Sequence, residues 1–143
     1  MSMKLRVVVP PHPLIAHWLT MLRNAGTPAP IYATGLEELG RWLTYEAIRE
    51  WLPYRDEEIE TCQGKAKGKV IESRVPLITI PNMPGGLELW HGARKLLPNA
   101  QLWLGDLPLS IEKNAGIILL WDQITNGQSV SYTHLTLPTI CSV

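Results

Sequence analysis

The chain has 143 residues, of which 45% are hydrophobic and 18% charged, and its 13 basic and 13 acidic residues leave no formal net charge. This length suffices for one domain with its own core, and the composition excludes a disordered chain. The charge balance excludes the strongly basic surface of nucleic-acid-binding or membrane-surface proteins. Cys62 and Cys141 form neither a metal-binding nor a disulfide pattern, and no stretch resembles a membrane span or a signal peptide. We therefore expect a cytoplasmic protein with no nucleic-acid or membrane partner.

The first predicted element is a helix over residues 13–24. Apolar residues recur along it at helical spacing. Pro13 suits the first turn, where the missing N–H of proline has no partner in the helix. Gly26 is the expected C-cap, and the two prolines within residues 27–30 are expected to separate this helix from the next element.

A second helix is predicted to begin at a capping box. Thr34 and Glu37 have the spacing at which the hydroxyl accepts a backbone N–H and the carboxylate reaches back to the N-cap. An apolar stripe follows, which we expect to face the core, and the charged residues between its members form a solvated surface. Pro53 marks the expected end of this helix.

A hairpin is predicted after the helical pair. Residues 57–62 are suited to an exposed or edge strand, and residues 70–71 resume a strand. Between them, residues 63–69 hold three lysines and two glycines, and we expect them to form the polar turn. Lysines in such turns are more often solvated than bound to phosphate.

A strand, a loop and a helix are predicted at residues 75–80, 81–86 and 87–97. The strand is apolar and β-branched, which is typical of a strand covered on both faces. The loop holds two prolines and two glycines, which end both regular elements. Backbone N–H groups at the start of a helix commonly bind anions, so Gly85 and Gly86 are candidate phosphate-binding residues. An ordinary connection between a strand and a helix is the alternative.

Two further strands are predicted at residues 101–104 and 117–121. Strand, helix, strand, turn and strand in this order predict a parallel α/β sheet with right-handed crossovers. The loops after Ile80 and Trp121 then lie at the same carboxyl edge, where such sheets bind ligands.

The N-terminal segments resemble those of the uracil phosphoribosyltransferase family. The run His-Pro-Leu-Ile at residues 12–15 resembles the opening helix of that family, and Glu-Leu-Gly-Arg-Trp-Leu-Thr-Tyr-Glu-Ala at residues 38–47 resembles its second helix. Residues 59–69 resemble its β-arm. The resemblance covers residues 11–129 and is closest up to Lys69. It implies an α/β fold with a type I phosphoribosyltransferase-like parallel sheet, flanking helices, an N-terminal helical pair and a β-arm, and it implies a homo-oligomer.

The same resemblance implies a reaction: uracil and phosphoribosyl pyrophosphate give UMP and pyrophosphate, with Mg²⁺. The family loop Pro-Ile-Leu-Arg-Ala-Gly-Leu matches residues 81–87, so Pro84 stands where an arginine contacts the pyrophosphate. Proline offers neither a charge nor a donor. A longer family segment with a second arginine and acidic residues corresponds here to residues 104–108 only. We assign no catalytic residue and no metal ligand in this chain.

The phosphoribosyl-binding loop of the family reads Asp-Pro-Met-Leu-Ala-Thr-Gly-Gly-Ser, and the matching stretch after residues 117–121 is one residue shorter. In such loops, backbone N–H groups and hydroxyls surround the phosphate. With Gly85 and Gly86, the residues that the resemblance assigns to phosphoribosyl pyrophosphate binding are Asp122, Thr125, Asn126, Gly127 and Ser129.

Residues 130–143 differ in character from the rest of the chain. Residues 130–139 hold no charged side chain and resemble the translated read-through of a transposase-type sequencing adaptor. We therefore expect a partial phosphoribosyltransferase-like domain at residues 1–129 and a non-native tail at residues 130–143. The family's uracil-recognition segment then has no counterpart. A genuine β-rich end is the alternative.

Three functions remain open from the sequence. The first is the uracil phosphoribosyltransferase of pyrimidine salvage, with phosphoribosyl pyrophosphate and uracil as its ligands. The second is a non-catalytic homologue that senses a nucleotide or binds a protein. The third is a small α/β binding module unrelated to nucleotides. The position of Pro84 predicts that this chain is catalytically impaired.

Overall fold

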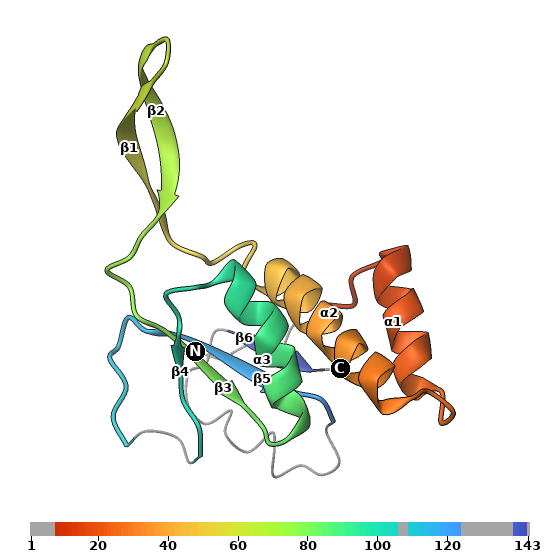
Figure 1. The fold of residues 1–143 in the computed structure, drawn as a ribbon. Coiled ribbons are helices and arrows are strands. Elements are labelled where there is room, and N and C mark those ends of the chain that lie inside the picture. The colour runs from red at the N-terminus through yellow and green to blue at the C-terminus, as the bar shows by residue number, and fades with distance from the viewer. Residues whose placement is uncertain (1–7, 106–108, 124–138, 143) are drawn as a thin grey trace.

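The computed structural model describes residues 8–105, 109–123 and 139–142. These residues form a helical pair, a projecting hairpin, and a parallel sheet with a helix against one face (Figure 1). Residues 8–9 belong to no regular element.

The first helix is present where it was predicted, and its C-cap differs. Helix α1 (Pro13–Arg23) begins at the proline, and the Nδ1 atom of His12 accepts the N–H of Leu14 at 3.2 Å. The C-cap is Asn24, in an extended conformation with φ of −78°. Its Oδ1 atom accepts the N–H of Gly26 at 3.0 Å, so the side chain makes the turn and Gly26 is not the cap.

The second helix begins five residues before the predicted capping box. Helix α2 (Ala29–Ala47) starts among the prolines, with Pro28 as the N-cap. A proline in the first turn costs no helical hydrogen bond, so these prolines start the helix where we had expected a break. Thr34 lies inside the helix and donates its hydroxyl to the carbonyl of Pro30 at 3.0 Å. The predicted capping box is therefore wrong, as is the predicted end at Pro53.

Two strands, β1 (Tyr54–Thr61) and β2 (Gly64–Ile71), form an antiparallel hairpin that we call the arm. The arm projects from the body (Figure 1). The lysine-containing stretch is not the turn, as predicted, but strand β2 itself. Cross-strand pairs of opposite charge stabilise a hairpin. The arm has three such pairs in direct register: Asp56 with Lys69, Glu58 with Lys67, and Glu60 with Lys65.

The sheet contains β3 (Leu77–Pro81), β4 (Gln101–Leu102), β5 (Gly116–Trp121) and β6 (Thr139–Ser142). Their order is β4-β3-β5-β6, and each neighbouring pair is parallel. The predicted parallel α/β sheet is confirmed, although β3 starts two residues later than expected and β4 is two residues shorter. Strand β6 was not predicted. Backbone pairing does not depend on the origin of the residues, so the non-native tail stays a prediction.

Helix α3 (Gly85–Leu96) lies between the sheet and α2. It starts two residues before the predicted position. Its buried residues Leu89 and Ala93 pack with Ile118 and Leu120 of β5 and with Leu36 and Leu39 of α2. The side chains that alternate with these along the sheet form a second cluster, which consists of Ile80, Ile117 and Leu119. The sheet is therefore apolar on both faces, as the strand composition predicts.

Helices α2 and α3 approach until their backbones touch. A Cβ atom on Gly40 of α2 would overlap the carbonyl oxygen of Leu89. A Cβ atom on Gly92 of α3 would overlap the carbonyl oxygen of Glu37. Because neither backbone can move aside without shifting a whole helix, both glycines fix the distance between α2 and α3.

Candidate functional site

The candidate site lies at the carboxyl edge of the sheet. Strands β3 and β5 are neighbours, with Pro81 opposite Leu120, so the loops that follow them begin side by side. Helix α3 starts at Gly85, directly after the first of these loops. The structure thus confirms that the two loops chosen from the sequence meet at one edge.

Asn82 and Asp122 join these two loops through their side chains. The Nδ2 atom of Asn82 donates to Oδ1 of Asp122 at 2.8 Å. The backbone N–H of Asp122 approaches Oδ1 of Asn82 at 3.4 Å. The backbone N–H of Asn82 also donates to the carbonyl of Leu120 at 2.9 Å. Both side chains are partly buried, so this pair ties the loop after β3 to the end of β5.

The same pair explains the two adjacent glycines at the start of α3. A Cβ atom on Gly85 would overlap Oδ2 of Asp122, and one on Gly86 would overlap Oδ1 of Asn82 and the carbonyl oxygen of Leu120. The space above each glycine is thus filled by a polar group of this chain. The Asp122 carboxylate stands at the N-terminal end of α3, where the helix dipole favours a negative charge.

The two loops carry no basic residue. Residues 81–87 and 121–129 contain neither lysine nor arginine. Pro84 is the N-cap of α3 and makes no side-chain cap hydrogen bond. A tightly bound phosphate usually has a charged clamp, and the side chains of these loops supply none.

The structure brings together part of the predicted set of ligand-binding residues. Gly85, Gly86 and Asp122 converge at the start of α3. Thr125, Asn126, Gly127 and Ser129 lie outside the described residues. The sequence reasoning missed Asn82, whose carboxamide donates a hydrogen bond to the Asp122 carboxylate. The available signal was a polar residue placed directly after a buried apolar strand at the carboxyl edge.

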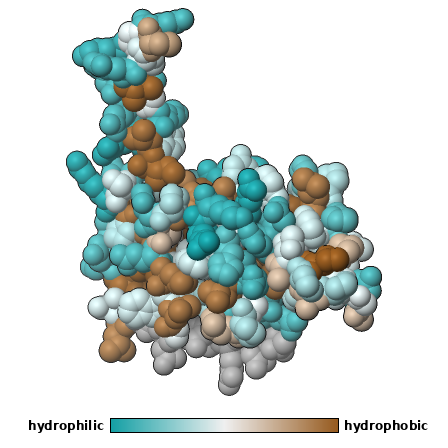
Figure 2. Space-filling view, viewed as in Figure 1, coloured by the Kyte–Doolittle hydropathy of each residue, from teal (hydrophilic) through white to brown (hydrophobic). Residues whose placement is uncertain are grey.

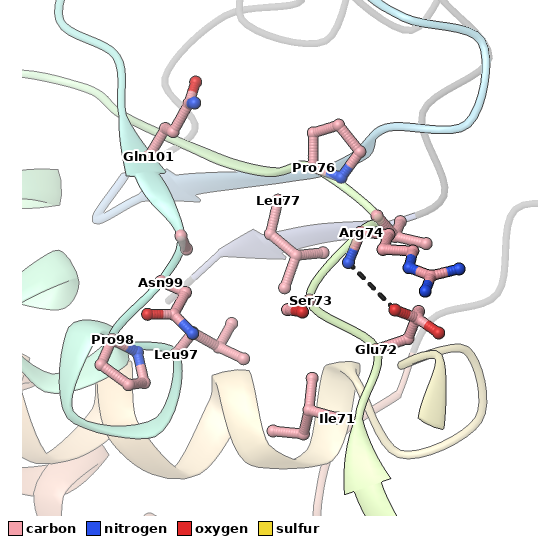
Figure 3. Close-up of a pocket in the computed structure, with 12 residues that line it drawn as sticks. Ile71, Glu72, Ser73, Arg74, Pro76, Leu77, Leu97, Pro98, Asn99 and Gln101 are labelled. Carbon is pink, nitrogen blue, oxygen red and sulfur yellow. Dashed lines mark hydrogen bonds between the residues drawn. The ribbon is translucent and has the colours of Figure 1, made fainter. Parts of the chain in front are cut away.

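A separate hollow of about 320 Å³ lies at the opposite, amino edge of the sheet (Figure 3). It separates the segment that leads from the arm into β3 from the turn that follows α3. On its rim, the backbone N–H of Arg74 donates to Glu72 at 3.1 Å. Its walls are mostly apolar and include Ile71, Pro76, Leu77, Leu97 and Pro98. The hollow is therefore distinct from the loops of the candidate site.

Among the described residues, no group of three His, Cys, Asp or Glu side chains is placed to hold a metal ion. Mg²⁺ commonly binds through one or two carboxylates together with substrate phosphates. Asp122 places one carboxylate between the two loops, and its Oδ1 atom already accepts from Asn82. Among the described residues of the two loops, the Asp122 carboxylate is the group that could contact a Mg²⁺ ion carried by a pyrophosphate. Within the described part of the chain, no helix is long and apolar enough to cross a membrane.

A parallel sheet with two loops that meet at its carboxyl edge, a helical pair and an arm defines an α/β protein with a phosphoribosyltransferase-like fold. The solved structure of a protein from Aquifex aeolicus has this fold: the TM-score is 0.70 at 21% identity, over 92% of this chain and 71% of that one. The model of the family "Uracil phosphoribosyltransferase" matches residues 9–131. The chain belongs to the uracil phosphoribosyltransferase family.

Two curated relatives support this membership. The uracil phosphoribosyltransferase of Synechococcus elongatus is 35% identical, over 93% of this chain and 69% of that protein. The uracil phosphoribosyltransferase of Synechocystis is 47% identical, over 91% of this chain and 68% of that protein. The first match spans 149 positions, more than the 143 residues of this chain, so it includes positions with no counterpart here.

Proposed function

We propose that this chain carries the scaffold of a uracil phosphoribosyltransferase of pyrimidine salvage and is impaired in catalysis. The family reaction joins uracil to phosphoribosyl pyrophosphate and releases pyrophosphate. Its relatives carry the name of that activity, which supports phosphoribosyl pyrophosphate and uracil as the ligands. Mg²⁺ would reach the site on the pyrophosphate and supply positive charge to the departing group.

The observation that carries the proposed impairment is the environment of Pro84. This residue stands at the start of α3, where a pyrophosphate clamp requires a charged donor, and neither loop has a basic residue. The nearest charged side chain in the described part of these loops is the Asp122 carboxylate, which overlaps the space above Gly85. The loops therefore supply no side-chain positive charge to balance the negative charge that develops on a leaving pyrophosphate.

Formation of UMP from uracil and phosphoribosyl pyrophosphate with Mg²⁺ tests this function. We expect the full chain to be at least about 100-fold slower than the Synechocystis relative, a typical loss when one stabilising donor is missing. The variant Pro84→Arg should bind phosphoribosyl pyrophosphate more tightly by about tenfold, because an arginine restores a bidentate donor. The control Pro98→Arg adds the same charge in the turn after α3, at the amino edge of the sheet. It should leave the affinity for phosphoribosyl pyrophosphate unchanged. A wild-type rate equal to that of the relative would disprove the impairment.

The alternative is a non-catalytic homologue that senses a nucleotide or binds a protein. This alternative is supported by the helical pair, which resembles that of the family, together with the absence of an arginine at the position of Pro84. Titration calorimetry separates the two: micromolar binding of phosphoribosyl pyrophosphate with no detectable turnover supports the non-catalytic role. Turnover at the rate of the relative excludes it.

We also propose that the protein is a cytoplasmic homo-oligomer. Figure 2 shows apolar residues among charged ones on the projecting arm. Tyr54, Ile59 and Ile71 of the arm are 62%, 41% and 49% exposed. Exposed apolar groups on a surface that few other elements contact favour association. Light scattering after gel filtration should give a mass at least twice that of one chain, and a monomer at all concentrations would refute this.

A further inference from the structure

Asn82 connects the two halves of the candidate site through both its side chain and its backbone. Its carboxamide nitrogen donates to Asp122, its carboxamide oxygen faces the N–H of Asp122, and its own N–H donates to Leu120. Asn82 precedes α3 and Asp122 follows β5, 40 residues later. One side chain therefore sets the position of the loop before α3 relative to the end of β5.

The contact also fixes the direction of the Asp122 carboxylate. With Oδ1 held by Asn82, Oδ2 lies above Gly85. Hydrogen bonds to a charged group are shorter and stronger than those between neutral groups, so they restrict rotation of the carboxylate. A Cβ atom on Gly86 would overlap the carboxamide oxygen of Asn82, so the partner itself is held by close packing against α3.

We propose that Asn82 is a positioning residue for the binding of phosphoribosyl pyrophosphate, acting through the Asp122 carboxylate. This inference rests on the proposed function, which names the ligand. Asp122 is the first residue of the loop that the family resemblance assigns to the ligand, and Asn82 holds its carboxylate in one orientation at the start of α3. Without the carboxamide, the carboxylate turns toward solvent and the two loops lose both hydrogen bonds between the Asn82 side chain and Asp122.

A charge swap distinguishes a positioning role from a structural one. Asn82→Asp places two carboxylates in contact and should lower the melting temperature. Adding Asp122→Asn to it restores one carboxylate and one carboxamide, and with them the hydrogen bond. We expect the swapped pair to melt like the wild type. Its affinity for phosphoribosyl pyrophosphate with Mg²⁺ should stay about tenfold below the wild type, because the carboxylate now lies on the other loop.

The single variant Asn82→Leu removes the donor and should weaken binding by a similar factor in titration calorimetry of the full chain. Asn114→Leu, an exposed asparagine in the turn before β5, is the matched control and should bind like the wild type. Three outcomes would overturn the proposal. Asn82→Leu could bind phosphoribosyl pyrophosphate as tightly as the wild type, the swapped pair could recover wild-type affinity, or the wild type could fail to bind this ligand at all. Fast formation of UMP by the wild type would disprove the proposed catalytic impairment. The binding comparison between Asn82→Leu and the wild type would still test the positioning role, because binding is measured without uracil.

Discussion

At the scale of single residues, a glycine is required where a distant side chain occupies the place of a Cβ atom. Gly85 is such a residue, because the Asp122 carboxylate lies above it. We expect Gly85→Ala to lower the free energy of unfolding by about 1–3 kcal/mol, the usual cost of overpacking. Urea unfolding measures this change. Gly26→Ala is the control, because the nearest atom to its new Cβ would be 3.5 Å away. If Gly85→Ala had the same free energy of unfolding as the wild type, the Asp122 carboxylate would be free to move away from the new Cβ atom, and the prediction would be wrong.

The residues of the site differ in how visible they are in the sequence. Gly85, Gly86 and Asp122 were recognisable because the loop motifs of the family align with them. Asn82 was missed, because a polar residue after a buried strand marks a position at the carboxyl edge but does not reveal a hydrogen bond to a residue 40 positions away. A pattern within one loop cannot report such a partner.

At the scale of elements, the packing of α2 on α3 depends on two glycines in contact with the opposite backbone. Alanine favours a helix over glycine by about 1 kcal/mol. We nevertheless expect Gly92→Ala to destabilise the protein by at least about 2 kcal/mol, because the overlap is with a backbone atom that cannot rotate away. Denaturant unfolding measures the difference. Gly35→Ala, whose Cβ meets only the side chains of Leu22 and Trp18 at 3.1 and 3.2 Å, should change far less.

An ion pair between α2 and α3 predicts a pH dependence. Lys95 hydrogen-bonds Glu37 and thereby lowers the pKa of this carboxyl below its ordinary value of 4.5. A lowered pKa means that the pair stabilises the fold above pH 4.5 and that this contribution is lost as the pH falls through the lowered value. Lys95→Met should therefore flatten the fall of the melting temperature below pH 4.5. The effect is small because both groups are partly exposed. Lys113→Met is the control. If the melting temperature of Lys95→Met fell below pH 4.5 as steeply as that of the wild type, the Lys95–Glu37 pair would not be the cause of the pH dependence.

The errors in the predicted elements arise where a local pattern had a competing interpretation. Thr34 and Glu37 have capping-box spacing, but the helix starts earlier, with the proline at residue 30 in its first turn. The Glu37 carboxylate instead accepts a hydrogen bond from Lys95. The lysines of β2 were assigned to a turn because glycines surround them. Their acidic partners on β1 lie opposite them in the hairpin, and this pairing extends the strand.

At the scale of the whole molecule, three of the four strands of the described sheet were predictable and the edge strand β6 was not. The apolar runs at β3 and β5 and the helix between them dictate a parallel pair with a right-handed crossover. The pairing of β6 with β5 has no signal in the sequence, because residues 139–142 join the sheet through their backbone. The parallel sheet itself confirms the fold class that the family resemblance implied.

The arm and the body should differ in local stability. An isolated two-stranded hairpin is marginally stable in water, whereas β3 and β5 lie inside a sheet with a buried face. We expect the backbone amides of β1 and β2 to exchange their hydrogens at least about 100-fold faster than those of β5, measured by mass spectrometry in dilute solution. Repeating the measurement at higher protein concentration is the control. Protection of the arm that rises with concentration would show that another copy of the chain covers it. Equal protection of arm and sheet in a dilute monomer would disprove the expected difference.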